Sequence, residues 1–488
     1  MTERHIPYTE ISLSTHPGKR TDMLSLSDRL TVPQVFFNEK HIGGADDTLA
    51  LLVKVEKQFP SAEEYYKNEI ASQPDPEDPR LAVPTTPPVQ EKPAPPRDHE
   101  KSVDLPDGTK GTVLEVVTKL QQILPQEDLK FNITLYKKCF RGSDGVAALK
   151  KGFNIATDRE AVAFGKSLVR SQILHHVVDD HDFANDSSLF FRLHCYQEPL
   201  VLNSFRVWTE RVDKDGVSLM KRLKKLLGKV ESAVTNSEGL VDYKNAHKHE
   251  LYPVFEEAVC ELQRVDMGAF DEDTKLAFGI NLYNTMIKYA FMKVGIGSTT
   301  FARNSFFSGV SMNVGGHILS FNDLENGVLR ANRKGPANLT LPFPKDDKRL
   351  VLARKQVDCR IHFGLNCGAK SCPPVKNFTP QAIEEELRIV AQAFCEQEDN
   401  VRVDVENKTL YLTSILKWFR PDFAESKEAL PQAVVHFLRG EKQKKLQSLI
   451  DRSEGIKIKF NEYDWGTNAS DFVPFDSAVL KANVTKLL

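Results

Sequence analysis

Apolar residues recur three and four positions apart in several stretches that follow residue 112, and this spacing predicts helices. The stretches are TVLEVVTKLQQIL, SDGVAALKKGF and TDREAVAFGKSLVRSQIL, and a short strand pattern, SSLFFRLHCY, comes after them. The expected N-cap residues are Ser143 or Asp144 for the second helix, and Thr157 or Asp158, followed by Glu160, for the third. The region 112–200 is therefore predicted to be a compact helix-rich unit with a small β element.

Helix and strand patterns alternate in the region 205–488. A basic amphipathic helix begins at Val217, and we interpret its basic side as a solvated face, with a membrane-surface helix as the alternative. KLAFGINLYNTMIKYAFMKVGI is apolar nearly all round, which predicts a buried helix. VRVDVENKTLYLTSIL alternates on both sides of a turn and predicts a hairpin, and IKIKF at 456–460 predicts a further strand. The region is expected to be one large mixed α+β domain.

The periodic pattern stops between residues 59 and 105, where the chain is acidic and rich in proline. After Tyr66 the segment has almost no aromatic or branched apolar residues, so it cannot bury enough surface to offset its ordering entropy. We therefore expect a disordered linker over 59–105, which separates a small N-terminal piece, 1–58, from the rest of the chain.

Composition and charge narrow the class of protein. The 488 residues exceed what one core normally holds, and 41% apolar and 27% charged residues are typical of a globular protein. The formal net charge of −2 leaves no overall nucleic-acid footprint. No run has the length of a membrane-spanning helix, and the first residues lack the apolar core of a signal peptide. Seven scattered cysteines favour reduced thiols in a cytosol-like compartment over a disulfide framework.

The stretch TVPQVFFNEKHIGGADD, residues 31–47, combines several features of a peptide-binding site. A cis bond between Val32 and Pro33 would turn the backbone outward and leave the polar groups of Val32 free for an extended peptide. Gly43 and Gly44 allow close approach of a ligand, and the helix that follows offers free amides to a carboxylate. The carboxylate of Asp46 could bind an ammonium group. A ligand with both groups, such as glutathione, would suit this arrangement.

This stretch resembles the second half of a glutaredoxin, and the likeness covers about residues 5–58. IPYTEISL resembles the second strand of that family, and GKRTDMLSLSDRL its second helix. In the family a Cys-Pro-Tyr-Cys motif comes before this point, whereas here only Met1-Thr2-Glu3-Arg4 do. The resemblance implies a partial thioredoxin-like fold that binds glutathione and, without the reactive thiolate, cannot run dithiol exchange. Of two explanations, a truncated gene model or isoform of a complete enzyme is favoured over a natural remnant that no longer catalyses.

The middle region contains YKKCFRGSDGV, an HHV run and HDFANDSSLFFRL. His175 and His176 point in different directions if they lie on a strand, so a structural role is favoured over a metal ligand or a base. Five basic residues near one helix and loop suggest a patch for an anionic surface, with a solvated face as the alternative. They are Lys137, Lys138, Arg141, Lys150 and Lys151.

The region 106–200 closely resembles a DEP domain on these motifs. The resemblance implies a small helical, winged-helix-like domain without catalytic activity. It also implies docking to a membrane surface or to a membrane-associated receptor.

Candidate chemistry concentrates in RIHFGLNCGAKSCPP, where His362 precedes Cys367 and Cys372. Three interpretations are open: small buried cysteines with a structural histidine, which is favoured; a thiol site activated by His362; and a metal site. The spacing fits no standard zinc motif, and no metal is expected. A disulfide is geometrically possible across the tight loop, although the compartment argues against a permanent one. Asn281 and Asn284, one turn apart on the predicted buried helix, offer amides that could orient a histidine.

The C-terminal region is similar to the family called domain of unknown function 547. The likeness rests on FGINLYN, VGGHILSFNDLENGVLR, RIHFGLNCGAKSCPP, LYLTSILKWFRPDF and YDWGTN, over about residues 215–470. The chain departs from the family at Gly279, where tryptophan is common, and at Asn326, where histidine is common. The family name carries no activity, so this resemblance identifies the domain at 205–488 without assigning a function.

Two hypotheses follow from these patterns. The first is an intracellular signalling or adaptor protein with a DEP docking domain and a glutathione-binding segment; it would be cytoplasmic, with peripheral membrane attachment and protein partners but no nucleic acid. The second is an enzyme. It would be a glutathione-dependent disulfide oxidoreductase in a complete form of the protein, or a thiol hydrolase or acyl-transfer enzyme that uses Cys367 or Cys372 with His362.

Overall fold

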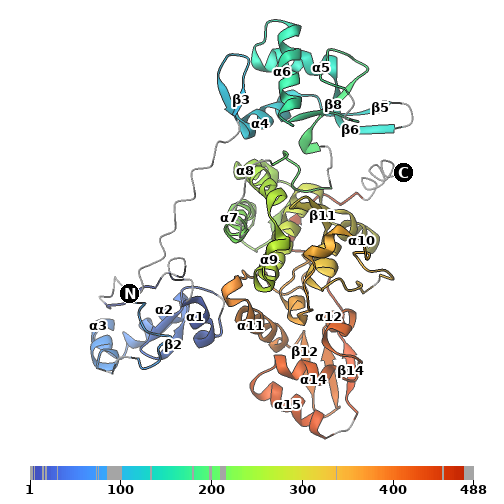
Figure 1. Ribbon diagram of the computed structural model, residues 1–488. Helices are drawn as coiled ribbons and strands as arrows, with labels where there is room; N and C mark the ends of the chain where they lie inside the picture. Colours follow the sequence, from blue (N-terminus) through green and yellow to red (C-terminus); the bar gives the residue numbers. More distant parts are fainter. Residues whose placement is uncertain are drawn as a thin grey trace. The chain divides into compact units, whose positions relative to one another are not determined.

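The chain forms two compact units in the computed structural model. The first unit comprises residues 1–96, 359–364 and 376–462, and the second comprises residues 97–358, 365–375 and 463–488. The residues that the structure describes are 4, 6–11, 13, 16, 19–29, 31–72, 74, 76–84, 102–131, 134–178, 181–196, 200–208, 216–336, 338–452 and 455–476. Figure 1 gives the helices and strands along the chain. The expected mixed α+β, multidomain class is confirmed.

The N-terminal part of the first unit contains two helices and one hairpin. Strands β1 and β2 pair antiparallel, with Phe37 opposite Lys40 and a bulge after Val35. The bounds are α1 Lys19–Ser27, β1 Val35–Phe37, β2 Lys40–Gly43 and α2 Ala45–Val55. Residues 6–11 form no strand, contrary to the expectation from the glutaredoxin resemblance. A strand needs a partner, and among the described residues no segment pairs with this one.

Part of the predicted linker is helical. Helix α3, Ala62–Tyr65, begins at Ser61, whose hydroxyl accepts the amide of Glu64, and a π-helical turn, Tyr66–Ile70, continues it. The segment folds because Ala62 joins a small core with Ile6, Leu52 and Val55, and aromatic residues at 59, 65 and 66 pack against it. The prediction of an extended linker from residue 59 was wrong for this stretch. Residues 85–101 of the predicted linker lie outside the described residues.

The C-terminal part of the first unit confirms two predicted strand patterns. Strands β12 and β13 form the expected hairpin, with Val401 opposite Leu412, and β14 adds to β13 in parallel. The bounds are α11 Ile383–Glu396, β12 Val401–Asp404, β13 Thr409–Leu412, α12 Ser414–Trp418, α13 Arg420–Phe423, α14 Leu430–Val434, α15 Gly440–Asp451 and β14 Lys457–Phe460. Single 3-10 turns lie at Cys359–Phe363, Pro380–Ala382 and Val435–Phe437.

Helix α1 packs on α11, so the two parts of the first unit share a core. Met23 and Leu24 of α1 form one buried cluster with Ala382 and Ile389. Beside this cluster, the Nε of Arg20 lies 2.6 Å from the Oε1 of Glu386, whose side chain is fully buried. Burial raises the pKa of Glu386, while Arg20 opposes that rise. The glutaredoxin-like segment is therefore anchored to the C-terminal region through an ion pair and an apolar contact.

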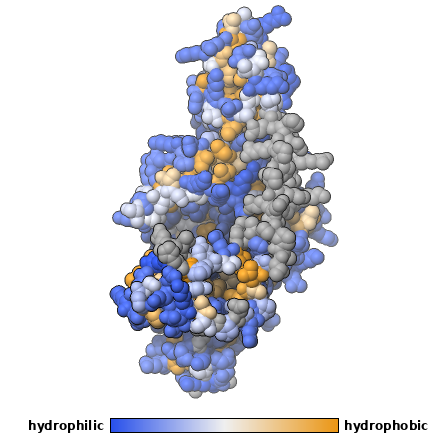
Figure 2. All heavy atoms as spheres, turned by 90° about the vertical axis from the view of Figure 1, so that its left-hand side faces the viewer, coloured by the Kyte–Doolittle hydropathy of each residue, from blue (hydrophilic) through white to orange (hydrophobic). Residues whose placement is uncertain are grey.

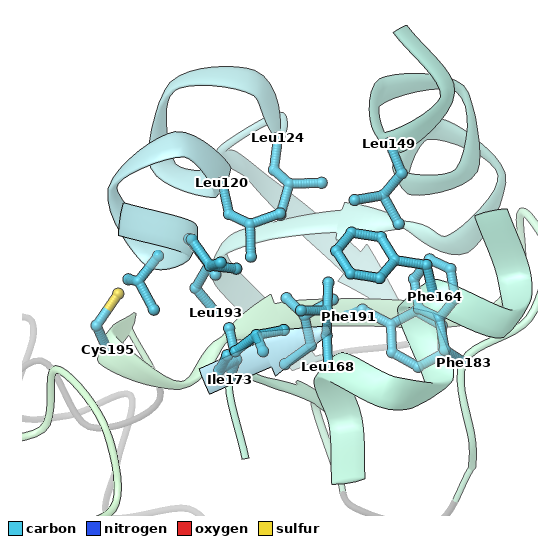
Figure 3. Packing of buried hydrophobic residues seen from close by; sticks show 14 of the residues in the cluster. Leu120, Leu124, Leu149, Phe164, Leu168, Ile173, Phe183, Phe191, Leu193 and Cys195 are labelled. Carbon is cyan, nitrogen blue, oxygen red and sulfur yellow. The ribbon is translucent and has the colours of Figure 1, made fainter. Parts of the chain in front are cut away.

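The DEP region occupies the start of the second unit. Its sheet has the order β5-β6-β8-β7, and helices α4, α5 and α6 supply most of its core. Figure 3 shows Leu120 of α4, Leu149 of α5 and Phe164 and Leu168 of α6 in one cluster with Phe191 and Leu193 of β8. The bounds are β3 Ser102–Asp104, β4 Lys110–Thr112, α4 Val113–Ile123, β5 Glu127–Phe131, β6 Thr134–Arg141, α5 Gly142–Phe153, α6 Asp158–Arg170, β7 Leu174–His176 and β8 Phe190–Leu193.

Two of the three helices in this region begin with the capping box that their sequence indicates. Thr157 caps α6 by accepting the amide of Glu160, whose carboxylate returns a bond to the Thr157 amide, as the capping box predicts. Thr112 and Glu115 do the same for α4. Helix α5 begins one turn earlier than expected, at Gly142 after Arg141, so neither Ser143 nor Asp144 is its N-cap.

The rest of the second unit surrounds the long helix α9, which is buried along most of its length, as predicted. Helices α7 and α8 pack on it, and α7 buries Leu219, Leu223 and Val230 on its apolar side. The bounds are α7 Val217–Ala233, β9 Val241–Asp242, α8 Leu251–Ala258, α9 Glu272–Val294, α10 Thr300–Gly309, β10 Ser311–Val314, β11 His317–Ser320 and β15 Ala469–Asp471. None of the described helices has both the length and the apolar character that crossing a bilayer requires. On the face drawn in Figure 2, hydrophilic side chains predominate and apolar ones form smaller groups.

We predict that Arg20→Ala lowers the free energy of unfolding of the first unit by about 3 kcal/mol, because the buried Glu386 carboxylate loses its countercharge. The pKa of Glu386 is already raised in the folded state and rises further in the variant. The destabilisation should therefore be largest at neutral pH and shrink as the pH falls toward the ordinary value of a glutamate. Native-state hydrogen exchange of α11 amides measures this.

The matched control is Lys67→Ala, which removes the exposed Lys67–Glu63 pair of the same unit. Its effect should be much smaller than that of Arg20→Ala, because solvent screens an exposed ion pair. Equal effects of the two variants would contradict the account of the Arg20–Glu386 pair.

Candidate functional sites

The structure brings together the residues predicted to bind a glutathione-like ligand. The Val32–Pro33 peptide bond is cis, as expected. The carbonyl oxygen of Pro33 lies 3.7 Å from the position that a Cβ on Gly44 would occupy, so these two residues face each other. In the described part of the chain, the backbone N–H and C=O of Val32 have no hydrogen-bond partner, and its side chain is exposed. We call Val32, Pro33, Gly43, Gly44 and Asp46 the cradle.

Two further residues, Asp47 and Arg29, shape the cradle, and neither was predicted from the sequence. Asp47 accepts the Gly44 amide at 3.0 Å and the Nη1 of Arg29 at 2.6 Å. These two bonds, the amide first, lower the pKa of Asp47. Asp47 also lies against Gly43: a Cβ on residue 43 would be only 2.2 Å from the Oδ2 of Asp47. The φ of +126° at Gly43 favours glycine as well. The position of Asp47, three residues after the helix N-cap, was the available signal.

Asp46 and the start of α2 remain open to a ligand. The Asp46 carboxylate is exposed and has no ion pair or hydrogen bond among the described residues. Helix α2 is eleven residues long, and the first amides of a helix lack partners within it. The cradle therefore presents one free carboxylate for an ammonium group and free amides for a carboxylate.

The five basic residues of the DEP region do not form one patch. Arg141 precedes α5 whereas Lys150 and Lys151 lie in its last turn, which places them about 14 Å apart along the helix axis. Lys150 pairs with Asp158 at 2.7 Å. Lys138 extends over the ring of Tyr196 at 4.8 Å, and burial lowers its pKa. The patch was predicted because these residues are close in sequence, whereas helix α5 places Arg141 and the two lysines at its opposite ends.

The β5–β6 hairpin is the most exposed apolar feature of the DEP region. Only Phe140 and Arg141 of β6 pair with β8, so the rest of the hairpin extends beyond the four-stranded part, as Figure 1 shows. Phe131 and Leu135, on either side of the turn, are 54% and 47% exposed. Lys137 follows on the same strand, half-buried and without an ion pair among the described residues.

The adjacent histidines of the DEP region lie in the sheet. Both are buried in β7, and the Nδ1 of His175 lies 2.8 Å from the carbonyl oxygen of His176. Their burial fits the favoured structural role. Among the described residues, no group of three or more His, Cys, Asp or Glu side chains could hold a metal ion.

Cys367 and Cys372 form a contact pair in the second unit. Both are free thiols, half-buried, with their sulfurs 3.2 Å apart. The sulfur of Cys372 also accepts the amide of Cys367 at 3.2 Å and lies 3.1 Å from the hydroxyl of Tyr463. We call Cys367, Cys372 and Tyr463 the dithiol site.

The loop that carries the cysteines is fixed at several points. Asn366 donates its amide to the Oδ1 of Asn284 at 2.8 Å, and its side chain donates to the carbonyl of Pro373 at 2.8 Å. Gly368 has a φ of +89°, and a Cβ there would lie 2.4 Å from the ring of Phe291. On the other side, Lys370 donates its amide to the carbonyl of Gly466 at 2.7 Å. The loop is thus held between α9 and the segment after residue 463.

Hydrogen bonding separates the pKa values of the two thiols. The bond from the Cys367 thiol, followed by those from Tyr463 and the Cys367 amide, lowers the pKa of Cys372 to about 7 despite its burial. The same contact with Cys372, together with burial, raises the pKa of Cys367. Burial and the two nearby sulfurs raise the pKa of Tyr463, so its hydroxyl remains a donor. The pair can therefore hold one negative charge and one shared proton near neutral pH.

His362 belongs to the first unit. Its Nε2 lies 2.8 Å from the Oδ2 of the buried Asp422, and its ring stacks on Phe419 at 4.0 Å. Activation of a thiol by His362 stays a prediction; within the second unit, the Tyr463 hydroxyl and the Cys367 amide donate to the Cys372 sulfur.

The two buried asparagines of α9 each accept a hydrogen bond through the side-chain oxygen. The Oδ1 of Asn281 accepts Lys224 at 3.0 Å, while Asn284 holds the cysteine loop through Asn366. Tyr463 was not singled out from the sequence, although it opens the YDWGTN motif. The departures at Gly279 and Asn326 are packing positions: a Cβ at Gly279 would lie 2.7 Å from Leu329, and Asn326 accepts Arg330 at 2.7 Å.

We predict that the rate of alkylation of Cys372 rises with pH and reaches half its maximum near pH 7, because the thiolate is the reactive form. Trypsin cuts after Lys370, so peptide 371–376 reports on Cys372 and peptide 361–370 on Cys367. Buried Cys260, whose pKa burial raises to about 12, is the internal control and should remain unlabelled. A midpoint for Cys372 at or above that of a free model thiol would contradict the described hydrogen bonds.

Comparisons with known proteins agree with the predicted composition of the chain. A model described as "Glutaredoxin" matches residues 1–42. A model described as "Domain found in Dishevelled, Egl-10, and Pleckstrin (DEP)" matches residues 124–193, and one described as "Protein of unknown function, DUF547" matches residues 267–395.

Two curated relatives are similar to short parts of the chain. Glutaredoxin 3 of Escherichia coli K12 is 37% identical over 51 residues, which are 10% of this chain and 61% of the relative. The human phosphatidylinositol 3,4,5-trisphosphate-dependent Rac exchanger 2 protein is 36% identical over 64 residues, which are 13% of this chain and 4% of the relative. The chain thus spans less than two thirds of the length of either relative. The predicted combination of a glutaredoxin-like segment, a DEP domain and a DUF547 region is confirmed by these matches.

Proposed function

We propose that the protein is an intracellular signalling adaptor that binds a glutathione-like peptide in its cradle and docks through its DEP domain. The observation that carries the proposal is the cradle itself, where the Pro33 carbonyl faces Gly44 at the open start of α2. An adaptor of this kind would couple a docked location to the presence of a small thiol peptide.

The chemistry of the cradle favours a ligand with an extended backbone and charges at one end. The N–H and C=O of Val32 can pair with a peptide as a neighbouring strand would. The start of α2 favours a carboxylate, and Asp46 favours an ammonium group. The γ-glutamyl end of glutathione carries both groups.

Exposed apolar residues support docking through the β5–β6 hairpin. Phe131 and Leu135 can enter the boundary between headgroups and acyl chains, and Lys130 and Lys137 beside them favour anionic lipid. The human relative is named for dependence on an anionic lipid headgroup, and a lipid surface is the partner that we propose here. Such a protein would be cytoplasmic with peripheral membrane attachment.

We predict that Asp46→Asn weakens the binding of S-methylglutathione to the full chain about tenfold, because one charge-assisted contact is lost. This ligand cannot exchange thiols, so the measurement is independent of the cysteines. Ligand-observed NMR titration gives the dissociation constants. Glu64→Gln, at an exposed position on α3, is the control and should bind as the unchanged chain does. Absence of binding to the unchanged chain would contradict the proposal.

We predict that the double variant Phe131→Ala, Leu135→Ala reduces flotation of the full chain with phosphatidylserine-containing vesicles at least tenfold. Each side chain loses burial of roughly 1.5 kcal/mol or more. Added salt should weaken the binding further, since the basic contribution is screened. Val178→Ala changes an equally exposed apolar residue that follows β7, at the other edge of the sheet, and should leave flotation unchanged. Equal losses in both variants would contradict docking by the hairpin.

A further inference from the structure

The dithiol site has the geometry of two thiols poised to join. Their sulfurs are 3.2 Å apart, so a bond of about 2.05 Å requires an approach of only about 1.2 Å. The two cysteines are separated by four residues, among them Gly368. Four of the other five described cysteines differ: Cys139, Cys195, Cys260 and Cys395 are buried, and burial raises the pKa of each.

Polar donors converge on the sulfur of Cys372. The Tyr463 hydroxyl and the Cys367 amide lie 3.1 and 3.2 Å from it, and both can donate to a thiolate. A buried structural cysteine needs no such donors. One further titratable group faces the pair. Tyr283 of α9 is buried, burial and the nearby charges raise its pKa, and its hydroxyl donates to Glu325 at 3.2 Å.

A small, partly open pocket lies beside Cys367. Aromatic side chains form much of its lining, namely Phe291, Phe306, Phe307 and Trp465. Arg303 lies at the same pocket with its guanidinium 4.8 Å from the ring of Trp465. This guanidinium has no carboxylate partner among the described residues, so it can receive a carboxylate from a ligand.

We propose that Cys367 and Cys372 form a redox-active dithiol that reduces a small carboxylate-bearing disulfide held at this pocket. This activity lies in the second unit and does not rest on the cradle. The thiolate of Cys372 attacks one sulfur of the substrate, RSSR, and the first RS⁻ leaves and takes up a proton. Cys367 then loses its proton and attacks the Cys372 sulfur of the mixed disulfide, which expels the second RS⁻.

The reaction transfers two electrons from the protein dithiol to the substrate disulfide. Two protein thiols and RSSR become one Cys367–Cys372 disulfide and two RSH, and an excess of RSH reverses it. Tyr463 acts as a positioning residue because its hydroxyl stabilises the attacking thiolate without touching the substrate disulfide. Arg303 selects for a carboxylate on the substrate.

The test exposes the reduced full chain to increasing ratios of glutathione disulfide to glutathione at pH 7, with acid quenching, thiol blocking and trypsin digestion. Because trypsin cuts after Lys370, the disulfide joins peptides 361–370 and 371–376 into one species that mass spectrometry identifies. We expect this species to rise with glutathione disulfide and to vanish with excess glutathione. In Cys367→Ser, peptide 371–376 should instead carry a glutathione adduct. Absence of the joined species at every ratio, including glutathione disulfide alone, would overturn the proposal.

Two variants test the assigned roles. Tyr463→Phe should slow disulfide formation about tenfold at pH 7 and move the midpoint of its pH profile upward, as loss of one hydrogen bond to a charged group requires. Arg303→Gln should slow the reaction with glutathione disulfide but not with cystamine, which has no carboxylate. An unchanged pH profile in the first variant overturns the role of Tyr463, and equal slowing with both disulfides overturns that of Arg303. Cys359→Ser, outside the pair, is the control and should react as the unchanged chain does.

Discussion

The hydrogen bond from the Asn366 amide to the side chain of Asn284 is the constraint on which the dithiol site depends. Asn284 lies on α9, the buried helix around which the second unit is built, so the bond connects the cysteine loop to the core of that unit. The backbone bond from Lys370 to Gly466 fixes the other side of the loop. Held from both sides, the loop places the two sulfurs in contact and directs the Cys372 sulfur toward Tyr463.

In the first unit, a few specific contacts also fix the N-terminal segment. Asp47 ties Arg29 to the amide of Gly44 and so fixes the start of α2, while Asp46 beside it remains open. Helix α1 is held to α11 by the Arg20–Glu386 pair and by apolar contacts. The cradle and the dithiol site would both act on small thiol peptides, one by binding and the other by exchange, each within its own unit.

Local patterns predicted local structure well. The capping box of Thr157 and Glu160, the buried helix α9 and the β12–β13 hairpin each depend on residues close in sequence. The helix at 62–70 was missed because an average over a proline-rich segment hides one N-cap serine and the aromatic residues around it. The cradle was found because its parts lie within seventeen consecutive residues, 31–47.

Contacts between distant residues could not be predicted from one sequence. Tyr463 lies 91 positions from Cys372, and Glu386 lies 366 positions from Arg20. No periodicity connects such pairs, and only the folded chain brings them together. The contacts of His362 with Asp422 and Phe419, about sixty positions further along the chain, were likewise not predicted. In the DEP region, basic residues that are close in sequence were predicted to form one patch, but the length of α5 separates them.

The most direct test of the central constraint is the hydrogen exchange of the Asn366 amide in the unchanged chain and in Asn284→Leu. Leucine favours the helix and keeps the branching at Cγ but removes the acceptor. The account predicts strong protection of the Asn366 amide in the unchanged chain and about tenfold or greater loss of protection in the variant, while amides in the middle of α9 remain protected. Equal protection of the Asn366 amide in both proteins would contradict it.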